Sequence, residues 1–257
     1  WYQNAMRITR VQQSVPSALA SLIADVVDFS RPMWRGGAAG STRVERAAEM
    51  LEHRGSSSRF ARLRQLFTPA DRRRLTAGEL AETSSLRDDR VSEDLRAMYE
   101  ACDGSDLRRM RYVDIRTYLA DCLMPKADVS SMAHGLELRA PLLDHEIVRF
   151  ALSLPDDYLH DGKRGKLPLR SLVARYLPAE LFARPKQGFT PPVTEWLRTS
   201  HADSMRRLAR SERFSALGWF KPEFIDALGN EHLAGNRDNG ERLFALLVLD
   251  EWLKEHG

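Results

Sequence analysis

The stretch from Lys126 to His145 restricts the fold more than any other, because it interrupts a helical pattern twice within a short length of chain. Asp128 predicts a helix N-cap, since its carboxylate can accept hydrogen bonds from the free backbone N–H groups of a first turn. Gly135 weakens the last turn of that helix, and Pro141 cannot continue it. We therefore expect a short helix from Asp128 followed by an irregular strap over Glu137–Leu143.

The strap and its flanks are rich in ionisable groups, with Asp144 predicted to cap a second helix beyond the strap. The remaining groups are Lys126, Asp128, His134, Glu137 and Arg139. A purely structural interpretation accounts for them: the aspartates cap helices, Glu137 pairs with Arg139, and His134 lies on a helix surface. On the residues alone, this interpretation is favoured over a binding site.

A second motif, Arg184–Phe189, lies between a predicted helix end and Pro191–Pro192. The prolines stiffen the backbone, while Gly188 permits positive φ and a close backbone approach. Lys186, held in this way, could place a cation against a phosphoryl group as charge develops in a transition state. A solvated loop lysine is the alternative, and the residues alone favour it.

Together these two motifs resemble the C-terminal signature of the asparagine synthase family. The resemblance covers Tyr118–Arg198 clearly, including Gly165–Lys166 with Leu169–Arg170, and covers the flanking helices only loosely. Pro168 departs from the family pattern. We interpret this departure as a later start of the local helix, at Leu169, and not as a loss of the family's chemistry.

The resemblance implies a fold and a reaction. It implies a mainly α fragment, the helical C-terminal part of an α/β adenine nucleotide α-hydrolase-like (PP-loop) synthetase domain whose parallel sheet lies largely upstream. In that family a glutaminase releases ammonia. ATP and Mg²⁺ activate the side-chain carboxylate of aspartate as β-aspartyl-AMP, and ammonia then gives asparagine, AMP and pyrophosphate.

The sequence lacks the family's N-terminal cysteine and its Ser-Gly-Gly-x-Asp-Ser pyrophosphate loop, and residue 1 is Trp rather than Met. We therefore expect a fragment of a longer chain, inactive alone, with the ATP and Mg²⁺ sites largely upstream. Its expected partners are aspartate, ammonia and ATP, together with upstream glutaminase and PP-loop regions. A homo-oligomer stays open.

The resemblance also assigns roles to residues. It implies that Lys186 contacts the phosphates at the adenylation site and is the catalytic lysine. Lys166, Arg170 and Arg184 are candidates for contacting the nucleotide, although a solvated first-turn lysine is the more frequent case. The candidates for positioning the substrate or the strap are Lys126, Asp128, Glu137 and Arg139.

Two rival functions remain. One is a related amidotransferase or cyclase that acts on another carboxylate, such as a sugar acid or a peptide side chain, because such relatives share these motifs. The other is a helical interaction module that keeps the scaffold without the chemistry. A full-length gene without the pyrophosphate loop would favour the second.

Charge and composition exclude several other classes. The 39 basic and 36 acidic residues give a net charge of only +3, which argues against a nucleic-acid footprint despite the Arg72–Arg74 cluster. No run approaches the roughly 18 apolar residues of a membrane span, so a cytoplasmic protein is expected. Cys102 and Cys122 lack metal-site spacing and are expected to be buried, reduced thiols.

Helical periodicity runs along the whole chain, without an alternating strand or an internal repeat. We divide it into a helical lead-in (1–105), the signature region (106–200) and terminal helices (201–257). Gly36–Thr42 imitates a phosphate loop but is interpreted as a linker, because no lysine precedes its Ser-Thr. Helices are predicted to start at Ser14 or Ser17, at Ser58 and at Thr68–Pro69, and one helix is predicted around Trp196. In the helix from Ser58, we expect Phe60, Leu63, Leu66 and Phe67 to point inward. The other predicted helices span 42–53, 91–101, 106–123, 146–154, 169–176, 178–182, 203–213, 222–233 and 240–255.

Overall fold

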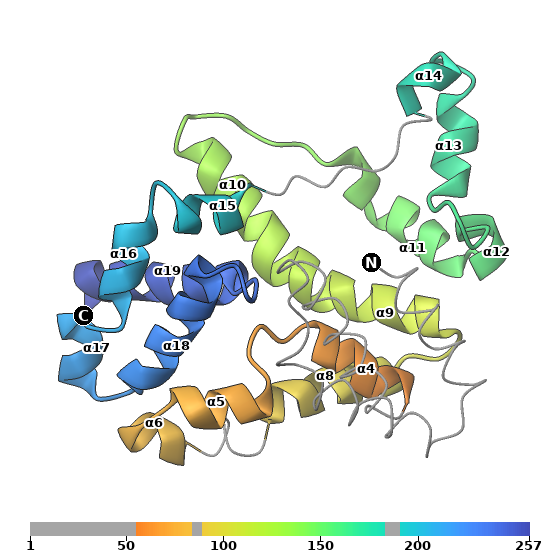
Figure 1. Ribbon diagram of the computed structural model, residues 1–257. Helices are drawn as coiled ribbons and strands as arrows, with labels where there is room; N and C mark the ends of the chain where they lie inside the picture. The colour runs from red at the N-terminus through yellow and green to blue at the C-terminus, as the bar shows by residue number, and fades with distance from the viewer. Residues whose placement is uncertain (1–54, 84–88, 183–190) are drawn as a thin grey trace. The chain divides into compact units, whose positions relative to one another are not determined.

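The computed structural model describes residues 55–83, 89–182 and 191–257, and these residues are mainly helical (Figure 1). In these ranges there is no strand, only the isolated antiparallel bridges Thr76–Phe220 and His160–Gly165. The expectation of a mainly α chain is therefore confirmed. The predicted helices before Gly55 and the Gly36–Thr42 linker lie outside the described residues.

The chain divides into two compact units. Unit 1 comprises Trp1–Thr9 and Leu95–Gly188, and unit 2 comprises Arg10–Asp94 and Phe189–Gly257. The described helices of unit 2 are α4 (Ser56–Leu63), α5 (Pro69–Leu75), α6 (Gly78–Glu82), α15 (Val193–Arg198), α16 (Ala202–Leu208), α17 (Glu212–Leu217), α18 (Pro222–Leu233) and α19 (Gly240–His256).

Helix α8 (Arg90–Glu100) passes from unit 2 into unit 1. The other described elements of unit 1 are α9 (Asp106–Asp114), the π-helix η2 (Ile115–Leu123), α10 (Met124–Met132), the 3₁₀ turn η3 (Pro141–Leu143), α11 (His145–Ser153), α12 (Asp156–Leu159), α13 (Leu167–Val173) and α14 (Ala179–Phe182).

The core of unit 2 forms where the apolar faces of its helices meet. Leu243 of α19 and Leu208 of α16 are almost completely buried there. The other buried members are Leu75, Leu197, Met205, Ala209, Phe214, Phe224, Ile225, Leu228, Leu246 and Leu253. On α16, α18 and α19 these residues recur at helical spacing, so each of these three helices presents an apolar stripe to the core.

Local capping signals set several boundaries in unit 2. Thr68 and Asp71 form a capping box: the Thr68 hydroxyl accepts from the Asp71 N–H at 2.9 Å, and the Asp71 carboxylate accepts from the Thr68 N–H at 3.2 Å. The single helix predicted over 203–213 is wrong. The chain instead forms α16, which ends at Leu208, and α17, which starts at Glu212 and is capped by Ser211. Leu66, predicted to point inward, is 45% exposed, because α4 ends at Leu63 and the helical period stops there.

In unit 1, α9, η2 and α10 follow one another without a break in helical backbone (Figure 1). The predicted helix start at Asp128 is therefore wrong, since Asp128 lies inside α10. A carboxylate can cap a helix only where the backbone enters it and leaves N–H groups without partners, and no such entry occurs here. Cys122 is exposed on η2, so its predicted burial is also wrong, although both cysteines are free.

The end of α10 is formed by Gly135, which takes a φ of +66°. The Leu136 N–H donates to the Ser131 carbonyl and the Gly135 N–H to that of Met132, both at 3.0 Å. This pair of bonds is the Schellman stop that a left-handed glycine permits. Residues 136–140 then form the non-helical strap, which continues into the 3₁₀ turn of Pro141–Leu143.

Asp144 caps α11 as predicted. Its carboxylate accepts from the Glu146 N–H at 2.9 Å and from the Ile147 N–H at 3.4 Å. The strap is thus bounded by a glycine stop on one side and a carboxylate cap on the other.

The different positions of Asp144 and Asp128 lead to a stability prediction. Asp144→Ala should lower the free energy of unfolding by about 0.5–2 kcal/mol, because it leaves backbone N–H groups of α11 without an acceptor. Asp128→Ala, on the exposed side of α10, should change it by less than about 0.5 kcal/mol. Urea denaturation of both variants in the same background measures the difference. A larger loss for Asp128→Ala would mean that a helix starts at Asp128 after all.

Candidate functional site

The strap carries one ion pair. Nη2 of Arg139 lies 2.6 Å from Oε1 of Glu137, and the two side chains are 83% and 68% exposed. The predicted pairing is therefore confirmed. Water screens a pair this exposed, so it contributes about 1 kcal/mol or less to stability. The pair can orient the strap but leaves both charged groups accessible.

Lys126 and Asp128 both lie on α10, and both are exposed. His134 is exposed just after the helix ends. Within the described residues, no hydrogen bond or ion pair links Lys126 or Asp128 to the Glu137–Arg139 pair. The structure thus places these candidates on neighbouring elements without joining them into one constellation.

Lys166 precedes α13 in a left-handed conformation, with φ of 59°, which is uncommon for a residue other than glycine. Helix α13 begins at Leu167, so the start predicted at Leu169 is wrong. Pro168 lies in the first turn, where its missing N–H costs nothing. Nε of Arg170 donates to the Gly165 carbonyl at 3.1 Å. Lys166 and Arg170 therefore flank one short helix entry.

The loop before Lys166 is ordered by Asp161. Its carboxylate accepts from the backbone N–H groups of Arg164 at 2.6 Å and Lys163 at 2.9 Å, and from the Arg164 side chain at 2.9 Å. These hydrogen bonds, the backbone ones first, lower the pKa of Asp161 to about 2. Arg184 and Lys186 lie outside the described residues.

Unit 1 exposes many large apolar side chains, on the strap, on the helices that flank it in sequence and on the segment from α12 to α14. Val129 is 67% exposed, Phe150 62% and Tyr176 77%. Others of this kind in unit 1 are Tyr118, Met132, Leu136, Leu138, Leu142, Ile147, Tyr158, Leu172 and Leu181. Exposed apolar area on this scale marks a surface built to pack against something else.

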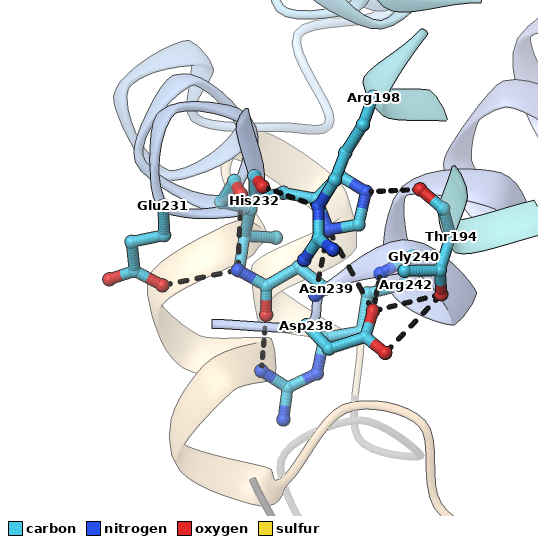
Figure 2. Close-up of polar contacts among 9 residues, drawn as sticks. Thr194, Arg198, Glu231, His232, Asp238, Asn239, Gly240 and Arg242 are labelled. Atoms are coloured by element: carbon cyan, nitrogen blue, oxygen red, sulfur yellow. Dashed lines mark hydrogen bonds and ion pairs between the residues drawn. The ribbon is translucent and has the colours of Figure 1, made fainter. Parts of the chain in front are cut away.

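Unit 2 contains a partly buried polar cluster that the sequence did not predict, formed by Thr194, Arg198, His232, Asp238 and Asn239 (Figure 2). His232 is fully buried. Its Nδ1 accepts from the Asn239 N–H at 3.2 Å, so Nε2 carries the proton and donates to the Thr194 carbonyl at 3.1 Å. Burial, and secondarily the charge of Arg198, lowers the pKa of His232 below its ordinary value of 6.5.

The same cluster holds the Thr194 hydroxyl. Oγ1 of Thr194 donates to Oδ1 of Asp238 at 3.0 Å, and Oδ1 also accepts from the Gly240 N–H at 3.0 Å. A Cβ on Gly240 would lie 2.6 Å from Thr194 Oγ1, so only glycine fits this approach. Arg198 closes the group by donating from Nε to the His232 carbonyl at 2.9 Å.

Sequence reasoning missed this cluster because its members are separated along the chain. The only local signal was Asp238–Asn239–Gly240, a typical lead-in to a helix. Nothing in the sequence pairs that tripeptide with Thr194, which lies far upstream. The pairing follows from the packing of α15, α18 and α19 on the shared core.

Comparison with known proteins gives the family. The model of the family Asparagine synthase matches residues 1–254, so the chain belongs to the asparagine synthase family. The chain is 29% identical over 60% of its length to asparagine synthetase (glutamine-hydrolysing) 1 of Bacillus subtilis. It is 30% identical over 79% of its length to a provisionally named asparagine synthetase of Mycobacterium bovis. A shorter region, 30% of the chain and 14% of the relative, is 43% identical to the asparagine synthetase of Mus musculus.

The matched regions span 24% of the Bacillus relative and 30% of the Mycobacterium one. No solved structure matches the chain significantly. None of the described helices combines the length and apolar character needed to cross a bilayer.

Within the described residues, no three His, Cys, Asp or Glu side chains gather as a metal site requires. Lys166 is exposed, and Arg139 is paired with Glu137.

The buried histidine predicts a pH dependence of stability. Unfolded, His232 binds a proton below about 6.5. In the folded chain the pKa of His232 is lowered, first because burial disfavours the charged imidazolium and second because Arg198 lies nearby. The Thr194 carbonyl and Asp238, whose Oδ1 lies 3.7 Å from Nδ1, offset part of that effect. The contribution of neutral His232 to the free energy of unfolding is therefore complete above its unfolded pKa. It is lost as the pH falls through and below that pKa, by up to about 1.4 kcal/mol per pH unit.

Urea denaturation between about pH 7.5 and about pH 5.5 measures this slope. His232→Gln should be less stable at the higher pH but lose less on acidification. His134→Gln, at an exposed position, is the matched control and should keep the wild-type slope. An unchanged slope in His232→Gln would mean that His232 does not titrate differently in the folded state.

Proposed function

We propose that this chain is the helical C-terminal part of a glutamine-dependent asparagine synthetase. Within a longer chain, it would take part in the ATP-dependent amidation of aspartate through β-aspartyl-AMP. The observation that carries the proposal is the family match from residue 1 to 254, which includes both the strap and the Arg184–Phe189 motif. The relatives are named as glutamine-hydrolysing asparagine synthetases, which supports the proposal.

Lys186 is the residue we propose as catalytic. It lies between α14 and Pro191–Pro192, so rigid elements bound its segment on both sides. ATP with Mg²⁺ would supply the activation of the carboxylate when bound. The ammonium of Lys186 would stabilise the negative charge that develops as the carboxylate oxygen attacks the α-phosphorus and pyrophosphate leaves.

The signature region would form one wall of that site. We propose Lys166, Arg170 and Arg184 as further cationic contacts to the nucleotide. Lys126, Asp128, Glu137 and Arg139 would position the strap rather than react. Lys166 and the Glu137–Arg139 pair are all exposed, so their charged groups are accessible to a ligand or to another part of a longer chain.

The exposed apolar side chains of unit 1 support a role within a longer chain. An upstream parallel sheet, of the α/β adenine nucleotide α-hydrolase type, would cover them. The proposed partners are therefore this upstream PP-loop region and a glutaminase that supplies ammonia. Without them, we propose that residues 1–257 are inactive.

A related enzyme acting on another carboxylate is the second candidate. The Bacillus and Mycobacterium relatives are about 30% identical to this chain, over less than a third of their own length. Such identity supports the family but does not identify the carboxylate that is amidated. The contacts that select the acceptor would lie mostly outside this chain.

Lys186→Ala tests the proposed role in the longer protein. If the lysine acts mainly in the transition state, kcat for asparagine formation should fall on the order of 10²- to 10³-fold while ATP binding changes little. Glutaminase activity should survive. Lys186→Arg should rescue poorly, because a planar guanidinium does not occupy the compact position of an ammonium.

Lys254→Ala is the matched control, because Lys254 is an exposed lysine paired with Glu251 on α19. It should leave synthesis unchanged. A Lys186→Ala rate within about threefold of wild type, far from the expected loss, would refute the catalytic role.

A further inference from the structure

The loop of residues 160–166 lies between α12 and α13 in unit 1 (Figure 1). His160 and Gly165 form an antiparallel bridge across its ends. Inside the bridge, the Asp161 N–H donates to the Arg164 carbonyl at 3.2 Å. The loop is therefore closed by contacts of its own backbone.

Asp161 contributes the side chain that orders this loop. Its Oδ1 accepts from the backbone N–H groups of Lys163 at 2.9 Å and Arg164 at 2.6 Å. Its Oδ2 accepts from the Arg164 side chain, with Nε at 2.9 Å. Two residues of the loop are Gly162 and Gly165, and glycine loses the most conformational freedom when it is ordered. The carboxylate therefore restrains a segment whose composition favours flexibility.

Lys166 is held at the end of this loop from both sides. The carbonyl of the preceding residue, Gly165, accepts from Nε of Arg170 at 3.1 Å, and the Lys166 carbonyl accepts from the Arg170 N–H at 3.0 Å. The left-handed φ of 59° at Lys166 is unfavourable for a residue with a Cβ, and such strain persists only where surrounding contacts impose it. The side chain is exposed, and its ammonium forms no ion pair within the described residues. The loop thus fixes the backbone of Lys166 and leaves its charge available.

We propose that Asp161 is a positioning residue, which fixes the backbone from which Lys166 contacts the nucleotide. The inference rests on the proposed contact between Lys166 and ATP. A loop that is already ordered has less freedom to lose on binding, so the same contact gives a higher affinity. Asp161 acts through Lys166 and makes no contact of its own with the anionic nucleotide.

Binding of ATP with Mg²⁺ to the longer protein, measured by calorimetry without aspartate, tests this role. Asp161→Ala should raise the Kd for ATP by up to about 10-fold, the cost of ordering one long side chain on binding. At saturating ATP, kcat for asparagine formation should change little. Asp161→Asn should keep a Kd near wild type, because its amide oxygen can still accept from the N–H groups of Lys163 and Arg164. Equal loss of affinity in Asp161→Asn, or none in Asp161→Ala, would overturn the proposal.

Two control variants separate positioning from stability. Arg164→Ala removes only the side-chain pair to Oδ2 of Asp161 and should leave the Kd for ATP near wild type. Thr68→Ala removes a side-chain acceptor of a backbone N–H in unit 2, so it should lower the urea midpoint without changing that Kd. A rise of the Kd in either control equal to that in Asp161→Ala would overturn the positioning role.

A double-mutant cycle tests whether Asp161 acts through Lys166. Lys166→Gln, which keeps a long polar side chain and removes its charge, should raise the Kd for ATP by about 10- to 100-fold. In that background, Asp161→Ala should add little. Fully additive losses would overturn the positioning role and leave the Lys166 contact intact. An unchanged Kd in Lys166→Gln would instead refute the proposed contact, and the positioning role with it. If Asp161→Ala does not fold, Asp161→Ser, whose hydroxyl accepts more weakly, replaces it in both experiments.

Discussion

The packing of unit 2 depends on the buried, neutral imidazole of His232. Both of its ring nitrogens are used, one by the Asn239 N–H and one by the Thr194 carbonyl. Because a buried polar group without a partner is costly, this ring ties α15, the end of α18 and the start of α19 to one relative arrangement. The surrounding leucine-rich core supplies most of the apolar burial, but apolar contacts alone tolerate sliding, whereas these hydrogen bonds select one register.

Unit 1 is organised by a different constraint. Its strap takes its shape from backbone chemistry: the left-handed Gly135 ends α10, Pro141 opens a 3₁₀ turn, and Asp144 starts α11. The side chains around the strap bury little apolar area, so local conformation rather than packing sets its course. A strap defined in this way can present charged groups at fixed points while its apolar neighbours are left to pack against the upstream sheet we propose.

Local signals were predictable from the sequence, and long-range ones were not. Thr68–Pro69, Pro222 and Gly240 each marked a helix start, because capping and proline geometry act over a few residues. Asp128 carried the same signal, but it lies within a continuous helix. It does not act as a cap there, because the backbone before it is already helical. The π-helical geometry of Ile115–Leu123 has no compositional mark. The pairing of Thr194 with Asp238 depends on tertiary packing that no local pattern encodes.

The proposed role in aspartate amidation can be tested by the acceptor dependence of pyrophosphate release. The longer protein, supplied with ATP, Mg²⁺ and glutamine, would be given aspartate, a sugar acid or a peptide with a free side-chain carboxylate in parallel. We predict that pyrophosphate release requires aspartate and is matched by equal amounts of asparagine and AMP. Pyrophosphate release driven by another carboxylate, or none with aspartate, would contradict it.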